Sequence, residues 1–270
     1  MQKDAFMVKM VMFMNIVEAY EKAKKDLVLI KAKDPVFFLD NYTDNKDIEI
    51  AGFLASQFAY GRIDVFKRFL NILFERIGKS PYTFLRSGDF SSLSGLYYRF
   101  QKEADIIMLF KVLKRIIEEF GSIGNMVKTF YSKELVTTFN AIRKYLFNNS
   151  KRLTFFFPVP SPSNPMKRWN LFLRWMVRKD DIDKGLWDFI DKKALIVPLD
   201  ANLFKIGRCM GWTKAKSPSL KVALEITEAL KMLCPEDPLK YDFFLCHKIG
   251  IALNCKGIKS QNCEGKCPLY

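Results

Sequence analysis

The spacing of apolar residues in this 270-residue chain predicts an all-α fold. Between residues 104 and 120, apolar side chains recur at steps of three and four, the period of an amphipathic helix. The same period recurs along most of the chain, and Gly, Pro, Asn or Asp bounds each stretch. The best candidate strand, residues 153–157, runs at once into a proline-rich stretch at 158–165, so we expect an extended connector there.

The expected helices follow one another with short interruptions. The first, at residues 1–26, has charged residues among its apolar ones and no small-residue cleavage site, so it is an amphipathic helix and not a signal peptide. The others are expected at residues 48–60, 62–76, 104–120, 133–147, 165–178, 201–210, 220–233 and 239–253. These elements divide the chain into an N-terminal helix with its connector (1–46), a middle helical lobe (47–157), a lobe that begins at the prolines (158–245) and a Cys-containing tail (246–270).

The charge of the chain indicates a polyanionic partner. Lys and Arg number 44 against 29 Asp and Glu, which gives a formal net charge of +15. Nucleic acid is favoured over an anionic membrane, because basic and acidic residues are interspersed along many helices. No apolar stretch approaches the roughly 20 residues of a membrane span. With no export signal, six cysteines predict reduced thiols or bound metal in the cytoplasm.

Lys167 is a candidate nucleophile because of its place in a predicted helix. Asn164 is a suitable N-cap and Pro165 suits the first helical position, so Lys167 and Arg168 fall in the first turn. The helix dipole and Arg168 disfavour a cation there, which leaves more of the amine neutral, as a nucleophilic lysine requires. A phosphate-binding or solvated lysine is the alternative.

Asp200 is the second candidate for chemistry. It follows the apolar run at 194–197 and precedes the helix expected at 201–210, so we expect it to cap that helix. A carboxylate at a helix N-terminus also stabilises the cationic sugar that develops as a glycosidic bond breaks. Capping alone would explain Asp200 equally well, and the two roles are compatible.

This order of elements resembles the helix-hairpin-helix DNA glycosylases: a hairpin, a Lys-bearing helix, and a Val-Pro-Leu-Asp segment that opens another helix. The separation of Lys167 and Asp200 is similar to that in archaeal 8-oxoguanine glycosylases. In bifunctional members a lysine attacks the deoxyribose C1′, expels the base and forms a Schiff base, assisted by an aspartate. The resemblance implies a two-lobed all-α fold with the catalytic hairpin in residues 158–245. It also implies a DNA repair glycosylase with AP lyase activity on an oxidised purine such as 8-oxoguanine, and we expect a monomer.

The hairpin departs from the pattern of that superfamily. Glycines in a Leu-Pro-Gly-Val-Gly pattern, whose backbone N–H groups bind DNA phosphate, are replaced here by SPSNPM at 161–166. Proline nitrogens cannot donate hydrogen bonds, so the phosphate contacts must come from elsewhere. We expect DNA contacts from Asn164, Arg168 and Arg174, with Arg178 either joining them or forming a solvated face.

An extruded base needs aromatic faces and a polar group that reads its edge. We expect Trp169 and Tyr241 to supply aromatic faces. Gln57 precedes the segment AYGR at 59–62, and glycosylases often carry a strand-separating or base-contacting polar residue at that place. Asp242 lies in the late helix that lines the pocket of related enzymes. Because 14% of the residues are aromatic, a place in the core is the alternative for each aromatic side chain.

Four late cysteines form a candidate metal site. Cys246, Cys255, Cys263 and Cys267 are separated by eight, seven and three residues, intervals unlike those of endonuclease III relatives. Four thiolates in a short tail suit an iron–sulfur cluster or zinc, with His247 as a substitute ligand. Buried reduced thiols are the alternative. Two further cysteines, Cys209 and Cys234, are assigned to the core, and no cofactor is expected to be required for base excision itself.

Motifs along the chain resemble an uncharacterised bacterial and archaeal family, DUF2400. They are AYGR at 59–62, YYRF at 97–100, FLRWMVRKDD at 172–181, PLDANLFKIGR at 198–208 and PEDPLKYDF at 235–243. That family implies no activity, so the chemistry rests on the wider superfamily. A non-catalytic DNA- or RNA-binding module of the same fold is the alternative to an enzyme. A lone histidine and the lack of a P-loop motif disfavour hydrolase triads and ATP-driven chemistry.

Overall fold

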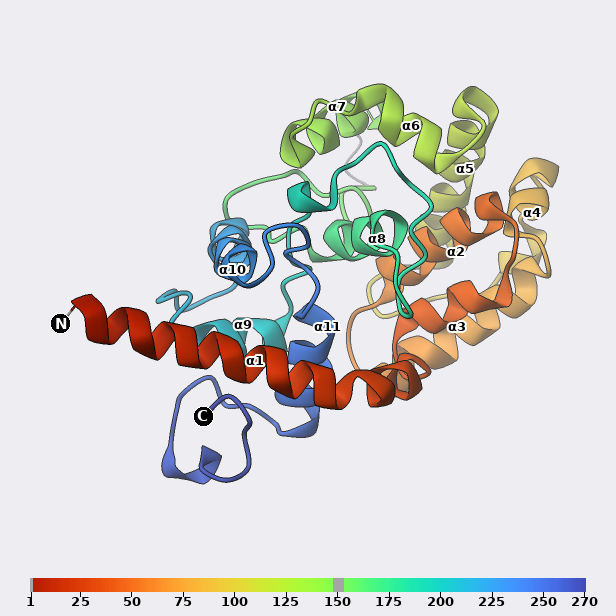
Figure 1. The fold of residues 1–270 in the computed structure, drawn as a ribbon. Helices are drawn as coiled ribbons and strands as arrows, with labels where there is room; N and C mark the ends of the chain where they lie inside the picture. Colours follow the sequence, from red (N-terminus) through yellow and green to blue (C-terminus); the bar gives the residue numbers. More distant parts are fainter. Residues whose placement is uncertain (1, 148–152) are drawn as a thin grey trace. The chain divides into compact units, whose positions relative to one another are not determined.

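The computed structural model of the chain describes residues 2–147 and 153–270 (Figure 1). Every regular element within these residues is helical, and the extended pairing there consists of two isolated bridges, Tyr98 with Gln101 and Lys179 with Lys184. The predicted all-α fold class is therefore confirmed. None of the helices in the described part of the chain combines the length and apolar content that a membrane span requires.

The chain folds into two compact units, each assembled from separate stretches of sequence. Unit 1 comprises residues 1–30, 161–170 and 195–270, and unit 2 comprises residues 31–160 and 171–194. Helix α8 (Lys167–Val177) begins in unit 1 and ends in unit 2. Both candidate catalytic residues, Lys167 and Asp200, therefore belong to unit 1.

Unit 2 is organised around α2 (Asn45–Phe58), which is buried from Asp47 onward. This helix contacts α3, α4, α6 and η1 (Figure 1). The other elements of unit 2 are η1 (Pro35–Asn41), α3 (Ile63–Ile77), α4 (Pro81–Ser87), η2 (Ser91–Leu93), α5 (Glu103–Phe120), α6 (Ile123–Phe130), α7 (Leu135–Phe147) and η3 (Lys192–Ala194). The longer helices α2, α3, α5 and α7 lie where the sequence predicts them, whereas the short elements were not predicted.

Unit 1 contains the long helix α1 (Gln2–Lys31), apart from its last residue, and the helices that follow η3. These are α9 (Ala201–Cys209), α10 (Leu220–Leu233), α11 (Asp242–Phe244), the π-helical segment η4 (Leu245–Ala252) and η5 (Gln261–Cys263). Helix α9 approaches α10 closely, since a Cβ atom at Gly207 would lie 2.5 Å from Cδ1 of Ile226. The single helix predicted at 239–253 is instead a short α-helical turn followed by a wider π-helical one.

Two local predictions are wrong. Residues 153–157 are not extended, because the backbone N–H groups of Phe156 and Phe157 both donate to the carbonyl oxygen of Leu153, at 3.0 and 2.9 Å. Helix α8 begins at Lys167 and not at Pro165, because Met166 has a positive φ of 53°. Asn164 therefore caps the turn before the helix, where its Oδ1 accepts from the Met166 N–H at 3.0 Å.

Candidate functional site

Lys167 and Asp200 both lie at helix starts and are both half-buried. Lys167 is the first residue of α8, and Asp200 is the N-cap of α9. The predicted capping role of Asp200 is confirmed, since its Oδ1 accepts from the Leu203 N–H at 2.7 Å. Its other oxygen, Oδ2, accepts from the Cys246 thiol at 3.4 Å. Hydrogen bonds from two elements thus fix the orientation of the carboxylate.

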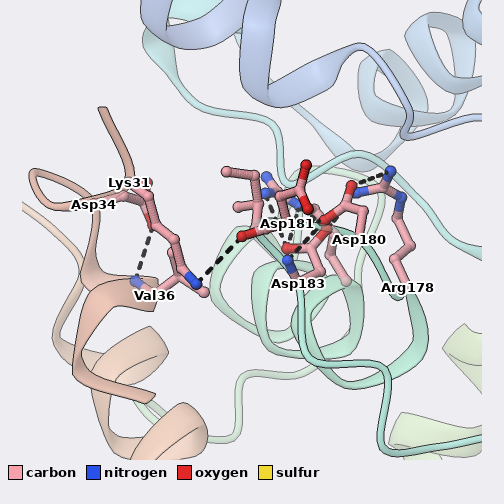
Figure 2. Close-up of polar contacts among 9 residues, drawn as sticks. Lys31, Asp34, Val36, Arg178, Asp180, Asp181 and Asp183 are labelled. Atoms are coloured by element: carbon pink, nitrogen blue, oxygen red, sulfur yellow. Dashed lines mark hydrogen bonds and ion pairs between the residues drawn. The ribbon is translucent and has the colours of Figure 1, made fainter. Parts of the chain in front are cut away.

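The predicted DNA contact of Arg174 is not supported, because its side chain is buried. Its guanidinium makes a bidentate pair with Asp183, with Nε 3.1 Å from Oδ2 and Nη2 3.1 Å from Oδ1. The side chain of Arg178 is buried too, at 4% exposed. It contacts the same carboxylate and pairs with Asp180 at 2.9 Å (Figure 2). Both arginines therefore hold unit 2 together, and Arg178 does not form a solvated face either. Of the predicted contacts, Arg168 is half-exposed at the start of α8 and Asn164 lies in the turn before it.

The loop after α8 is built around the carboxylates of Asp180 and Asp183. The Asp180 Oδ1 accepts from the N–H groups of Ile182 and Asp183, each at 2.8 Å. Lys31 bonds the carbonyl oxygen of Asp181 at 3.4 Å from the other side of the loop (Figure 2). Burial acts to raise the pKa of Asp180, but the charge of Arg178 and the two backbone donors outweigh it and hold this pKa below its usual range.

The four predicted base-pocket residues are buried. Gln57, Trp169, Tyr241 and Asp242 are each exposed by 3% or less. Gln57 lies in the buried helix α2, where its amide donates to the Ser56 hydroxyl at 3.4 Å. The ring of Tyr241 meets that of Tyr20 edge-on, with centroids 5.0 Å apart. In the described conformation these four side chains are packed in the core, so an extruded base would reach them only after the protein rearranges.

Three of the four predicted metal ligands share one cavity. Cys255, Cys263 and Cys267 line a space of about 130 Å³ in unit 1, and the fourth thiol there is that of Cys209. Cys246 is engaged with Asp200, and the His247 ring packs on Phe243 at 4.2 Å. The pKa of Cys209 is raised to about 11, first by burial and then by the three neighbouring thiols. Among the described residues, the structure places no group of three His, Cys, Asp or Glu side chains where it could hold a metal ion.

Two of the quoted motifs, AYGR and YYRF, meet in unit 2. The rings of Tyr60 and Tyr98 lie 4.9 Å apart, and the Tyr60 hydroxyl donates to the Tyr98 carbonyl oxygen at 3.2 Å. The Arg99 guanidinium lies over the rings of Tyr60 and Phe100, 5.8 and 5.5 Å from their centroids. Gly61 has a positive φ of 88°, which favours glycine, and the Arg99 side chain passes close to it, since a Cβ atom there would lie 2.6 Å from Nη1 of Arg99.

This aromatic–arginine patch, defined as Tyr60, Arg99 and Phe100, includes an exposed ring. The rings of Tyr60 and Phe100 are nearly parallel, at 7°, with centroids 6.5 Å apart. Phe100 is 70% exposed, and Tyr97 of the same motif is 75% exposed. Exposed aromatic rings beside a guanidinium are suited to stacking on nucleic-acid bases. The aromatic and basic composition of AYGR at 59–62 and YYRF at 97–100 is the feature of the sequence that could have predicted this patch.

Comparison with known proteins gives one match. The family described as protein of unknown function (DUF2400) matches residues 34–252. No curated protein and no solved structure matches the chain. The resemblance based on the five motifs is thereby confirmed, and the comparisons add no link to the helix-hairpin-helix glycosylases. Because the match covers most of its length, the chain belongs to the DUF2400 family, whose function is unknown.

Proposed function

We propose that this chain is a DNA glycosylase with AP lyase activity, in which Lys167 is the nucleophile and Asp200 its carboxylate partner. The observation that carries the proposal is their placement: both belong to unit 1, both lie at helix starts and neither is buried. Of the other predicted site residues, Arg174, Gln57 and Asp242 are buried. A two-lobed helix-hairpin-helix arrangement and a damaged-DNA partner are parts of the same proposal.

The reaction begins with attack of the Lys167 amine on C1′ of the deoxyribose. The bond from C1′ to the base nitrogen breaks, and its electron pair leaves with the base, which takes up a proton. As the sugar ring opens, its oxygen takes a proton from the attached nitrogen, and a Schiff base forms. Loss of a C2′ proton then expels the 3′ phosphate. The fixed carboxylate of Asp200 stabilises the positive charge that develops at C1′.

Borohydride trapping tests this proposal directly. The purified chain is incubated with oligonucleotides that carry 8-oxoguanine, uracil or an abasic site, in duplex and single-stranded form. We expect a covalent adduct with the wild-type chain and none with Lys167→Ala. Asp200→Asn keeps a side chain suited to the N-cap, so folding is preserved while trapping slows by on the order of 10²–10³-fold.

A matched control separates the nucleophile from a general effect of charge. Lys221 lies in unit 1 and its side chain is 82% exposed, so Lys221→Ala removes one positive charge without touching α8 or α9. We expect this variant to form the adduct as the wild type does. Trapping that persists in Lys167→Ala, or that fails equally in Lys221→Ala, would remove Lys167 from the role.

A non-catalytic nucleic-acid-binding module is the second candidate function. The aromatic–arginine patch favours it, because Phe100 and Arg99 offer stacking and charge without any catalytic group. The same substrates distinguish the two. Binding without an adduct and without base release on every oligonucleotide would support the module and contradict the glycosylase.

A further inference from the structure

The segment η4 brings a thiol into contact with the candidate catalytic carboxylate. The Cys246 thiol donates to Oδ2 of Asp200, with sulfur and oxygen 3.4 Å apart, and both residues are half-buried. The sequence predicted that the late helix would contribute Asp242 to the site. Asp242 is buried, and Cys246 from the same stretch of chain reaches Asp200 instead.

The backbone holds Cys246 in this position. Segment η4 packs on α9, and a Cβ atom at Gly250 would lie 2.6 Å from the Cβ atom of Asn202, so a larger residue there would push the two elements apart. Elsewhere on η4, Lys248 pairs with Asp26 of α1 at 2.7 Å. Contacts with two helices therefore fix the element that carries the thiol.

The local form of η4 also points to a functional role. Its hydrogen bonds have π-helical spacing, and the Leu253 N–H that closes the segment donates to the Lys248 carbonyl oxygen, five residues back, at 3.3 Å. Turns of this kind are rare within helices and are found frequently at functional sites. Here the π-helical segment is the one that meets the N-terminal end of α9.

We propose that Cys246 is a positioning residue for Asp200, a role that rests on the glycosylase reaction proposed above. The Leu203 N–H holds Oδ1 at 2.7 Å and the Cys246 thiol holds Oδ2, so the carboxylate cannot turn about its bond to Cβ without losing one of the two. A thiol is a weak donor. It therefore sets the direction of Oδ2 and leaves in place the negative charge that stabilises the cationic sugar. Cys246 itself forms no covalent bond and transfers no proton.

A purely structural role is the alternative, because a half-buried thiol also packs as a small apolar group. Two substitutions separate the roles. Cys246→Ala removes the donor, whereas Cys246→Ser replaces it with a hydroxyl donor at nearly the same place. Cys234→Ala, at the end of α10, removes a thiol that does not contact Asp200 and serves as the control.

The rate of borohydride trapping is measured for the full chain under single-turnover conditions, on a duplex oligonucleotide that carries 8-oxoguanine or an abasic site. We expect Cys246→Ala to lower the maximal rate about two- to tenfold, the net value of one hydrogen bond. The protein concentration that gives half of this rate should not change, because Cys246 positions a group and does not bind DNA. Cys246→Ser should restore most of the rate, and Cys234→Ala should retain all of it.

Infrared spectroscopy tests the hydrogen bond without any activity. The S–H stretching band of Cys246 is isolated as the difference between the spectra of the wild type and Cys246→Ala, and the same difference is taken in an Asp200→Asn background. A carboxylate is a stronger acceptor than a neutral amide, so the band should move to higher frequency in Asp200→Asn. The band of Cys234, isolated with Cys234→Ala, should not move.

The outcomes distinguish failure of this role from failure of the reaction. A wild-type rate in Cys246→Ala, or a rate in Cys246→Ser as low as in Cys246→Ala, would overturn the positioning role. An S–H band that does not respond to Asp200→Asn would overturn the contact itself. If the wild type forms no adduct, the proposed reaction falls and the role of Cys246 in it falls too, whereas the infrared spectra still show whether the thiol and the carboxylate are paired. Circular dichroism checks that each variant is folded.

Discussion

Two arginine-containing regions of unit 2 differ in how they meet solvent. Arg174, in the last turn of α8, and Arg178, directly after this helix, are buried and share the carboxylate of Asp183. Arg99 instead lies over the rings of Tyr60 and Phe100, and Phe100 is largely exposed. The partner decides the difference: a buried guanidinium requires a carboxylate, whereas one stacked on an aromatic ring keeps its charge available to a ligand. The net charge of +15 does not reveal which arginines face a nucleic acid.

The largest expected effect comes from breaking the buried region. Asp183→Ala removes the carboxylate that both guanidiniums share, and removal of one partner from a buried ion pair costs about 3–5 kcal/mol. We expect the free energy of unfolding to fall by that amount, measured by urea denaturation followed by circular dichroism.

Asp188 provides the matched control, because it lies exposed in the segment that follows the same loop. Asp188→Ala removes an equal charge and is expected to change the free energy of unfolding by less than about 0.5 kcal/mol. Equal losses in the two variants would show that the Arg–Asp network does not stabilise unit 2 beyond an ordinary surface charge.

A smaller effect, on binding and not on stability, is expected at the aromatic–arginine patch. Phe100→Ala removes an exposed ring, and stacking on a base contributes about 1–3 kcal/mol. We expect the affinity for single-stranded oligonucleotides to fall about tenfold, measured by fluorescence anisotropy at several salt concentrations. Phe37→Ala removes a half-exposed ring elsewhere in unit 2 and should leave the affinity unchanged. An unaltered affinity in Phe100→Ala would mean that this patch does not contact nucleic acid.

The periodicity of the sequence predicted the long helices because each spans several turns and has clear ends. Helix α10 matches its predicted range, and its N-cap Ser219 accepts from the Val222 N–H. The short elements η1 and α4 have too few turns for a period to show. The start of α8 was misplaced because the positive φ of Met166 depends on how the preceding turn folds.

The contacts of the candidate site were harder to predict. They join residues that are distant in the sequence or that lie on opposite sides of a loop. Arg174 has the spacing of a surface residue, and only the folded loop shows that Asp183 returns to it. Cys209 lies on a helical face far from the tail, so its sequence gave no reason to group it with Cys255. Asp200 was predictable because an N-cap depends on residues that follow directly along the chain.

The smallest effect is expected at Asp180, at the edge of the buried region, where water competes with Arg178 for the carboxylate. The Asp180 side chain is 33% exposed, and its pKa is lower in the folded chain than its usual value, so its ionised form contributes stability above that value. This contribution is lost as the pH falls through the folded-state pKa. Asp180→Asn removes the charge but leaves an oxygen that can accept from Ile182 and Asp183. We therefore expect the variant to be less stable than the wild type near neutrality, by under about 1 kcal/mol, and the difference to vanish in acid, where the wild-type carboxyl is protonated. Thermal unfolding across this pH range measures the difference in stability, and Asp181→Asn, at an exposed neighbouring residue, is the control. A difference that persists unchanged in acid would show that Asp180 acts through its hydrogen bonds and not through its pairing with Arg178.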